Sequence, residues 1–146
     1  MSLNGLMSKP PVVVEMDDDL TKIRDIFDLV SFHHLLVVRE HKLVGIISDR
    51  DYFKAVNTSL GTYSETSRDL LTLNKKAHQI MSRKVVTVSD TASVYDVVDL
   101  FNKTRMSCIP VVDKDNVPLG IISWKDIIRI LALNMERNIE RKQQSL

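Results

Sequence analysis

The sequence predicts a mixed α/β fold (α+β), built from two tandem β-α-β-β-α units that pack with pseudo-two-fold symmetry. Two observations carry this prediction: an internal repeat that covers most of the chain, and the same order of apolar patterns in each copy. The chain has 146 residues, which is enough for one domain or for two half-size units that share a core.

The internal repeat is the strongest feature of the sequence. Residues of the first half match residues 74 positions later, and the offset becomes 75 after one additional residue in the second copy. The matching segments are 6–14 with 80–88, 33–38 with 107–112, and 44–51 with 119–126. A register held over so many positions indicates a tandem duplication.

Both copies show the same order of predicted strands. Short runs rich in β-branched residues are typical of strands, and turn-forming residues separate the last two runs of each copy. The predicted strands are residues 12–14, 35–39 and 43–48 in the first copy, and residues 85–88, 109–112 and 119–123 in the second. The last two strands of each copy are predicted to form a hairpin.

Two helices are predicted in each copy, one after the first strand and one after the hairpin. Apolar residues recur there with helical spacing, and the predicted helices are residues 20–30, 49–56, 94–101 and 124–134. Three aspartates at residues 17–19 favour the start of the first of these helices. Asp90 or Thr91 is the predicted cap of the third.

The predicted domain organisation follows from the repeat. It consists of a first repeat at residues 6–56, a linker loop and helix at 57–79, a second repeat at 80–132, and a C-terminal helical extension at 133–146. Residues 67–79 are the helical part of the linker. Met135 and Ile139 are four residues apart in the extension, so they share a helix face and are candidates for docking on a neighbouring molecule.

The composition argues against several classes of protein. The 20 Lys and Arg against 19 Asp and Glu give a net charge of +1, without the positive excess of nucleic-acid binders or membrane-surface proteins. No apolar stretch approaches the roughly 20 residues of a membrane span, and no secretory signal is visible, so a cytoplasmic protein is expected. The single cysteine, Cys108, excludes an intramolecular disulfide and is expected to pack as a small apolar residue.

A Ser-x-x-Asp motif follows the hairpin in both copies, first with Ser48 and Asp51, then with Ser123 and Asp126. Serine at the N-cap with an acidic residue three positions later is typical of a capping box. Capping alone accounts for both motifs without a ligand. The alternative is that the same side chains also line a ligand-binding cleft.

The repeated unit resembles the cystathionine-β-synthase (CBS) domain, and the pair resembles a Bateman module. The resemblance is carried by residues 80–83, 85–88, 108–113 and 120–123 with Asp126, and by residues 6–8, 35–38 and 45–48 with Asp51. It implies a regulatory module that is not an enzyme, requires no cofactor, and binds AMP, ADP, ATP or S-adenosylmethionine in the cleft between the repeats. It also implies a homodimer. Many members of the family are attached to an effector domain, so the alternatives for this sequence are a stand-alone module, an effector protein that acts in trans, and a fragment of a longer chain. The sequence shows no nucleophile–base pair and no metal-binding cluster, so it gives no argument for catalysis.

The resemblance further implies roles for the two motifs. The acidic residue of the motif accepts hydrogen bonds from ribose hydroxyls in this family, so Asp51 and Asp126 are the candidates here. Ser48 and Ser123, with the free N–H groups at the helix starts, would then face phosphate.

His33 and His34 precede the second predicted strand of the first copy, where the family sometimes places a phosphate contact. Protonation would make such a contact depend on pH. The alternative is that both are solvated surface histidines. A metal site is not expected, because neighbouring residues on a strand point to opposite faces. The second copy has Ser107 and Cys108 at these positions, so the two clefts are expected to differ.

Three further positions bear on the clefts. Gly45 and Gly120 each stand alone in a predicted strand, where the backbone must approach another group closely; adenine and the facing repeat are the candidates. Trp124 stands where the first copy has Asp49, and it either stacks on adenine or fills the second cleft. A filled cleft leaves an alternative function, a homodimerisation or scaffold module with non-functional clefts.

Overall fold

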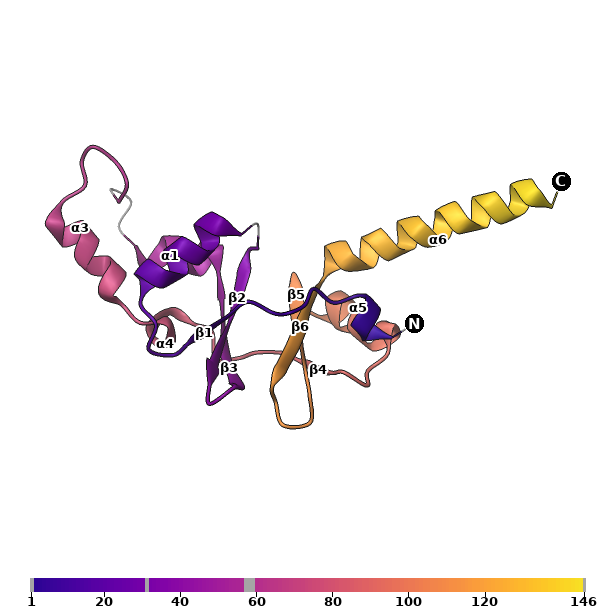
Figure 1. Ribbon diagram of the computed structural model, residues 1–146, viewed down its shortest axis with the longest axis horizontal. Helices are drawn as coiled ribbons and strands as arrows, with labels where there is room; N and C mark the ends of the chain where they lie inside the picture. Colours follow the sequence, from indigo (N-terminus) through magenta and orange to yellow (C-terminus); the bar gives the residue numbers. More distant parts are fainter. Residues whose placement is uncertain (1, 31, 57–59, 146) are drawn as a thin grey trace. The chain divides into compact units, whose positions relative to one another are not determined.

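The computed structural model describes residues 2–30, 32–56 and 60–145 and divides into two compact units (Figure 1). The repeat-1 unit comprises Pro11–Val85 and Asp115–Pro118, and the repeat-2 unit comprises Met1–Pro10, Val86–Lys114 and Leu119–Leu146. Each unit contains a three-stranded sheet with helices, which confirms the predicted mixed α/β class. The predicted linker begins at residues 57–59, which lie outside the described residues.

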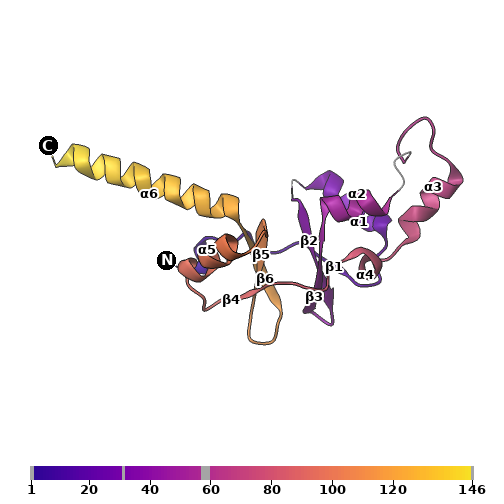
Figure 2. The ribbon, with the colours of Figure 1, turned by 180° about the vertical axis from the view of Figure 1, so that it is seen from behind.

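The repeat-1 unit follows the predicted order of elements. They are β1 (Val13–Glu15), α1 (Leu20–Leu29), β2 (His34–Arg39), β3 (Lys42–Ser48) and α2 (Asp49–Ala55). β2 is the central strand, parallel to β1 and antiparallel to β3. Figure 2 shows α1 and α2 on the same side of this sheet. The fully buried side chains of the core include Leu20, Ile23, Leu35, Val37 and Ile47.

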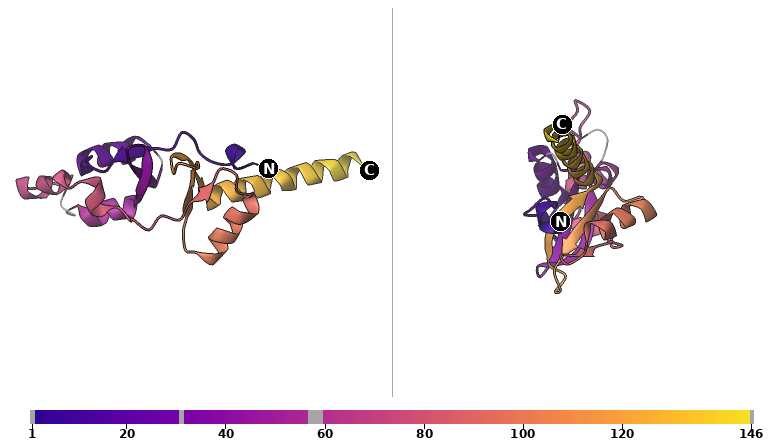
Figure 3. Two further views of the ribbon diagram at one scale, coloured as in Figure 1. Left: turned by 90° about the horizontal axis from the view of Figure 1, so that it is seen from below. Right: turned by 90° about the vertical axis from the view of Figure 1, so that its right-hand side faces the viewer.

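The repeat-2 unit has the same order. Its elements are β4 (Val88–Ser89), α5 (Val94–Lys103), β5 (Cys108–Val112), β6 (Pro118–Ser123) and α6 (Trp124–Gln144). β5 is central, with β4 parallel to it. The core includes Leu3, Leu6, Val97, Ile109 and Ile122. Within this unit, α6 extends as a straight rod well past α5 (Figure 3).

The prediction of one helix at residues 67–79 is wrong, because the segment forms three short pieces. These are α3 (Ser67–Leu71), a 3-10 turn (Thr72–Asn74) and α4 (Ala77–Ile80). The break lies at Lys75, whose backbone is extended. The Ala77 N–H then donates to the Asp18 carbonyl at 2.8 Å, and this pairing holds buried Leu73 and Ala77 in the repeat-1 core.

The cap of α5 also differs from the prediction of Asp90 or Thr91. Ser93 is the N-cap, and its Oγ accepts a hydrogen bond from the Asp96 N–H at 3.2 Å. The Asp90 N–H instead donates to the Val112 carbonyl at 3.1 Å, which extends the pairing of β4 with β5. Asp90 is thus held at the end of the strand, too early to cap the helix.

The first residues of each predicted repeat pair with the sheet of the other repeat. In the repeat-2 unit, Ser8 exchanges backbone hydrogen bonds with Ile121 of β6 at 2.9 and 3.1 Å. In the repeat-1 unit, Ser82 exchanges backbone hydrogen bonds with Ile46 of β3 at 2.9 and 3.0 Å. The β3 edge and the β6 edge therefore each pair with a segment that is distant in sequence.

This exchange explains Gly45 and Gly120. A Cβ on Gly120 would lie 2.7 Å from Met7 Sδ and 2.8 Å from the Ser8 carbonyl oxygen. A Cβ on Gly45 would lie 2.8 Å from Met81 Cγ. Within the described residues, a methionine of the other predicted repeat thus approaches each glycine closely, which confirms the facing repeat as one of the two expected groups.

Candidate functional site

The first Ser-x-x-Asp motif lies where β3 ends and α2 begins. Ser48 Oγ accepts a hydrogen bond from the Asp51 N–H at 3.1 Å, and Asp51 Oδ2 accepts one from the Ser48 N–H at 2.8 Å. The predicted capping box is therefore present. Asp51 is half-buried, and its Oδ1 makes no hydrogen bond to any residue that the structure describes. The motif keeps a carboxylate oxygen that capping does not use.

The second motif lies where β6 ends and α6 begins, and both oxygens of its carboxylate accept hydrogen bonds. Asp126 Oδ2 accepts hydrogen bonds from the Ser123 N–H at 2.7 Å and from Ser123 Oγ at 2.9 Å. Asp126 Oδ1 accepts one from Arg129 Nη2 at 3.1 Å. Asp126 is only 8% exposed. The two motifs share a sequence and a capping role, but they differ in what they leave for a ligand.

The hydroxyl groups of Ser48 and Ser123 also differ in what they leave for a ligand. Ser48 Oγ serves only as an acceptor in its capping box, so its hydroxyl hydrogen stays available for another acceptor. Ser123 Oγ donates its hydrogen to Asp126, so the second box closes on itself. The first motif therefore offers more hydrogen-bonding groups to a ligand than the second motif does.

His33 and Asp49 form a pair beside the first motif. The His33 Nδ1 lies 2.9 Å from Asp49 Oδ2, and the His33 carbonyl accepts the Asp49 N–H at 2.9 Å. Burial opposes ionisation of Asp49, but hydrogen bonds from His33 and the Arg50 N–H, with the nearby histidine charges, outweigh it and lower the pKa of Asp49 below 3.8. The exposed His33 ring is thus oriented by a carboxylate.

His34 is half-buried at the start of β2, where its register partner is Ser48. Burial lowers the pKa of His34 below 6.5 and disfavours its charged form. The carboxylates of Asp49 and Asp51 oppose this shift, and His33 adds to it. The two histidines therefore differ: His33 is exposed, and His34 is half-buried beside the motif.

The equivalent positions of the second copy are apolar or exposed. Cys108 is buried, and burial raises the pKa of its thiol to about 12, so it packs as the apolar residue that the sequence predicts. Trp124, the first residue of α6, is 47% exposed. In the described residues of its own unit, the indole is not buried in a core.

The structure thus brings four predicted site residues together in the repeat-1 unit: Ser48, Asp51, His33 and His34. Ser123 and Asp126 lie in the repeat-2 unit. Ligand contact by any of these six remains a prediction.

Two residues of the site were missed by the sequence analysis. Asp49 lies opposite His33 because His34 pairs with Ser48 in the hairpin, so the hairpin register was the available signal. Arg129 follows Asp126 by three positions on one helix, a spacing at which opposite charges meet.

The described residues hold neither a metal-binding cluster nor a membrane-spanning helix. Among residues 2–30, 32–56 and 60–145, no three His, Cys, Asp or Glu side chains are grouped to hold a metal ion. No helix in the same ranges is both long enough and apolar enough to cross a membrane.

The comparison with protein families decides the identity of the repeat. The model of the CBS domain matches residues 3–58 and again residues 77–133. This chain belongs to the CBS domain family. Its two matches confirm the tandem CBS pair that the internal repeat predicts.

Two curated relatives show how CBS pairs occur in other proteins. The L-aspartate semialdehyde sulfurtransferase of Methanocaldococcus jannaschii is 32% identical over 132 residues, which are 89% of this chain but only 23% of that protein. A CBS domain-containing protein of Dictyostelium discoideum is 30% identical over 133 residues, covering 90% of this chain and 91% of that protein. The same module is thus found as a small part of an enzyme and as nearly a whole protein.

A similar solved structure contains ligands. It is the CBS domain pair of protein MJ0100 in complex with 5'-methylthioadenosine and S-adenosyl-L-methionine. It superposes with a TM-score of 0.73 at 29% identity, covering 92% of this chain and 98% of that one.

Proposed function

We propose that this CBS pair binds an adenosine-containing ligand and acts as a sensing, regulatory module. The observation that carries the proposal is Asp51, whose Oδ1 accepts no hydrogen bond from the described part of the chain, at a motif to which the family resemblance assigns the ribose. The complex of the similar CBS pair with two adenosyl compounds supports the adenosine moiety as the shared chemistry of the ligand. 5'-Methylthioadenosine therefore joins AMP, ADP, ATP and S-adenosylmethionine as a candidate.

The first motif offers groups that suit a ribose. Two vicinal hydroxyls donate two hydrogen bonds, and a carboxylate with one free oxygen and a second partly used oxygen can accept both. The Ser48 hydroxyl can donate to a ligand oxygen, because the capping box does not use its hydrogen. The exposed side chains of His33 and Arg50 are the nearby candidates for an anionic group of the ligand.

We place no catalytic step in this chain, and we assign the response to an effector protein in trans in the cytoplasm. The relatives with enzyme names are much longer: this chain spans 23% of the sulfurtransferase and 22% of the inosine-5'-monophosphate dehydrogenase of M. jannaschii. Most of each enzyme thus lies outside the CBS pair, which supports a regulatory role for the pair.

Isothermal titration of the full chain with each of the five candidates tests the proposal. At least one is expected to bind saturably, and at 100 times its Kd to add about 2.7 kcal/mol to the free energy of unfolding. Asp51→Asn is expected to weaken binding by about 10- to 100-fold, because it removes a charged acceptor. Asp17→Asn, at a carboxylate that is 94% exposed, is the matched control.

The possible outcomes test the sensing function and the role of Asp51 separately. If none of the five compounds binds, the sensing function is overturned. If one binds and both variants bind it equally well, the function stands and the role of Asp51 is overturned.

A second candidate function is the homodimerisation or scaffold module with non-functional clefts. The exposed apolar side chains of α6, which include Met135 at 65% and Ile139 at 54%, favour an interface role. A stable dimer without response to any of the five compounds is the result that distinguishes it.

A further inference from the structure

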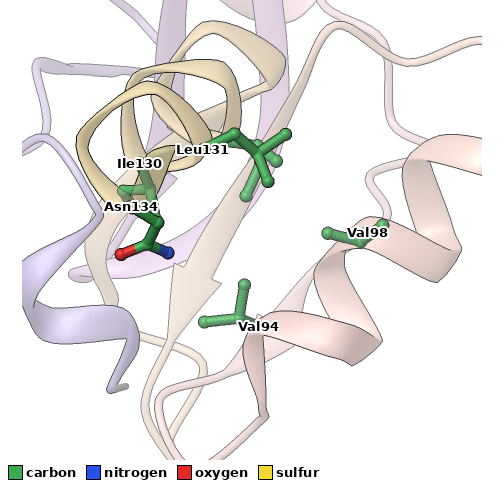
Figure 4. Close-up of a pocket in the computed structure, with 6 residues that line it drawn as sticks. Val94, Val98, Ile130, Leu131 and Asn134 are labelled. Carbon is green, nitrogen blue, oxygen red and sulfur yellow. The ribbon is translucent and has the colours of Figure 1, made fainter. Parts of the chain in front are cut away.

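Helix α6 carries two apolar faces, and the unit covers only one of them. Ile127 and Ile130 pack against the repeat-2 core. With Leu131 and Asn134 they also line an apolar pocket of about 240 Å³ against Val94 and Val98 of α5 (Figure 4). Every residue of α6 from Leu131 to Gln144 is exposed.

The second face is a stripe of large apolar side chains that point away from the core. We call it the α6 stripe; its members are Trp124, Ile128, Leu131, Met135 and Ile139. Their exposed fractions lie between 47% and 65%. Spacings of three and four residues place them on one side of the helix, over about 22 Å of its length at 1.5 Å per residue. Leu131 also lines the pocket, so stripe and pocket form one continuous apolar surface.

Residues 135–144 of α6 make no packing contacts with the rest of the described chain that would stabilise them as a helix, so a partner is expected to cover them. From Met135 to Gln144 the helix lies fully exposed. Helical segments of this length are marginal in water when nothing packs against them. A partner that covers the α6 stripe would supply that packing.

The α6 stripe is complementary to itself when the second helix runs antiparallel. A two-fold axis between Leu131 and Ala132 places Trp124 opposite Ile139 of the second copy, and Ile128 opposite Met135 of the second copy. At the centre, Leu131 meets the small Ala132. Each large side chain thus meets an apolar side chain, and the closest approach of the helices falls at an alanine.

Charges beside the α6 stripe favour the same orientation. Lys125 and Arg129 lie along one flank of its first half, and Glu136 and Glu140 lie along the same flank of its second half. An antiparallel pair sets the basic half of one helix against the acidic half of the other, on both sides of the axis. In a parallel two-fold pair this flank faces the opposite flank of the second helix, so the basic and acidic groups do not meet.

We infer that the α6 stripe binds α6 of a second copy of this chain, antiparallel, about a two-fold axis between Leu131 and Ala132. The inference deepens the homodimer part of the proposed function and does not depend on ligand binding. It names the surface, the orientation and the register of the interface.

Sedimentation of the full chain between about 1 and 100 µM tests the surface. The wild type is expected to dimerise, and Met135→Glu is expected to raise the dimer dissociation constant at least about tenfold. Leu133→Glu is the matched control, because Leu133 is exposed at 47% on the opposite side of the same helix. It is expected to change the constant by less than about twofold. A monomeric wild type, or equal losses in both variants, overturns the inference.

Cysteine cross-linking tests the orientation separately from dimerisation. An equimolar mixture of Ile128→Cys and Met135→Cys chains is expected to form a mixed disulfide, while each variant alone is not, because like residues lie about 10 Å apart along the axis. The native Cys108 is buried and does not compete. Cross-linking of each variant with itself would indicate a parallel pair and overturn the register, while a dimer through other surfaces would give no specific disulfide and overturn the interface.

Discussion

Arg129 donates from Nη2 to Asp126 Oδ1 at 3.1 Å, and so occupies the carboxylate oxygen that the equivalent Asp51 leaves unused. The side chain of Arg129 is 62% exposed, while that of Asp126 is 11% exposed. The duplicated motif has therefore diverged in its partners while its sequence stayed the same. In the second copy both carboxylate oxygens accept hydrogen bonds, whereas in the first copy Asp51 Oδ1 accepts none from the described residues.

Replacement of the two motif aspartates should therefore have unequal effects on stability. Asp126→Ala removes the acceptor of three hydrogen bonds and is expected to lower the free energy of unfolding by about 1–3 kcal/mol. Asp51→Ala removes one cap bond and is expected to cost about 0.5–2 kcal/mol. Arg129→Met, the control for the exposed ion pair alone, is expected to cost no more than about 1 kcal/mol. Urea unfolding measures all three, and a larger loss for Asp51→Ala than for Asp126→Ala would contradict the asymmetry.

The cap of α5 gives a test in which structure and sequence make different predictions. Ser93→Ala removes the N-cap acceptor of the Asp96 N–H and is expected to cost about 1 kcal/mol of unfolding free energy. Thr91→Ala is the control, because among the described residues Thr91 hydrogen-bonds only to Ser89. It is expected to change stability by less than about 0.5 kcal/mol. If thermal melts show equal losses of stability in the two variants, Ser93 is not the main cap and the prediction of Thr91 as the cap stands.

Local patterns predicted most of the fold because the forces involved are local. The hairpins, the four main helices and both capping boxes depend on residues a few positions apart, and the duplicated register fixed their order. The helix expected at residues 67–79 failed because tertiary hydrogen bonds, such as that from Ala77 to Asp18, outweigh helix propensity. Helix α6 runs to Gln144, so the predicted C-terminal extension is its second half.

The exchanged segments could not be predicted, because the pairing of Ser8 with Ile121 spans most of the chain. A repeat alignment assigns residues 6–8 to the copy that follows them, and no local pattern shows that they cover the other sheet. The two strand glycines were the available signal, since each marks a close approach, but the sequence does not say by what.

Gly120→Ala tests the exchange in the repeat-2 unit. The new Cβ would meet Met7 Sδ and the Ser8 carbonyl oxygen, and because backbone cannot move aside as easily as a side chain, we expect a loss of about 1–3 kcal/mol. Gly5→Ala is the matched control, since no atom lies within 4 Å of its Cβ position. Chemical denaturation that finds both variants as stable as the wild type would contradict the close packing of residues 7 and 8 on β6.

Protonation of His34 should destabilise the fold. Because burial holds the pKa of His34 below its unfolded value of 6.5, the folded state binds fewer protons than the unfolded state in this window. The free energy of unfolding therefore falls as the pH drops below 6.5. The groups that act on the ring are Asp49 and Asp51, which attract its proton, and His33, which repels it.

His34→Gln is expected to flatten this pH dependence, and denaturant unfolding at a series of pH values measures it. His41→Asn is the control, because His41 is exposed in the β2–β3 turn with φ of 67°, a conformation that asparagine tolerates. The stabilising ionisation of Asp49 acts in a separate window, where it is present above 3.8 and lost as the pH falls through the lowered pKa of that carboxylate. Loss of stability between neutral pH and 5 that persists unchanged in His34→Gln would show that another group controls it, and that His34 is not held neutral by burial.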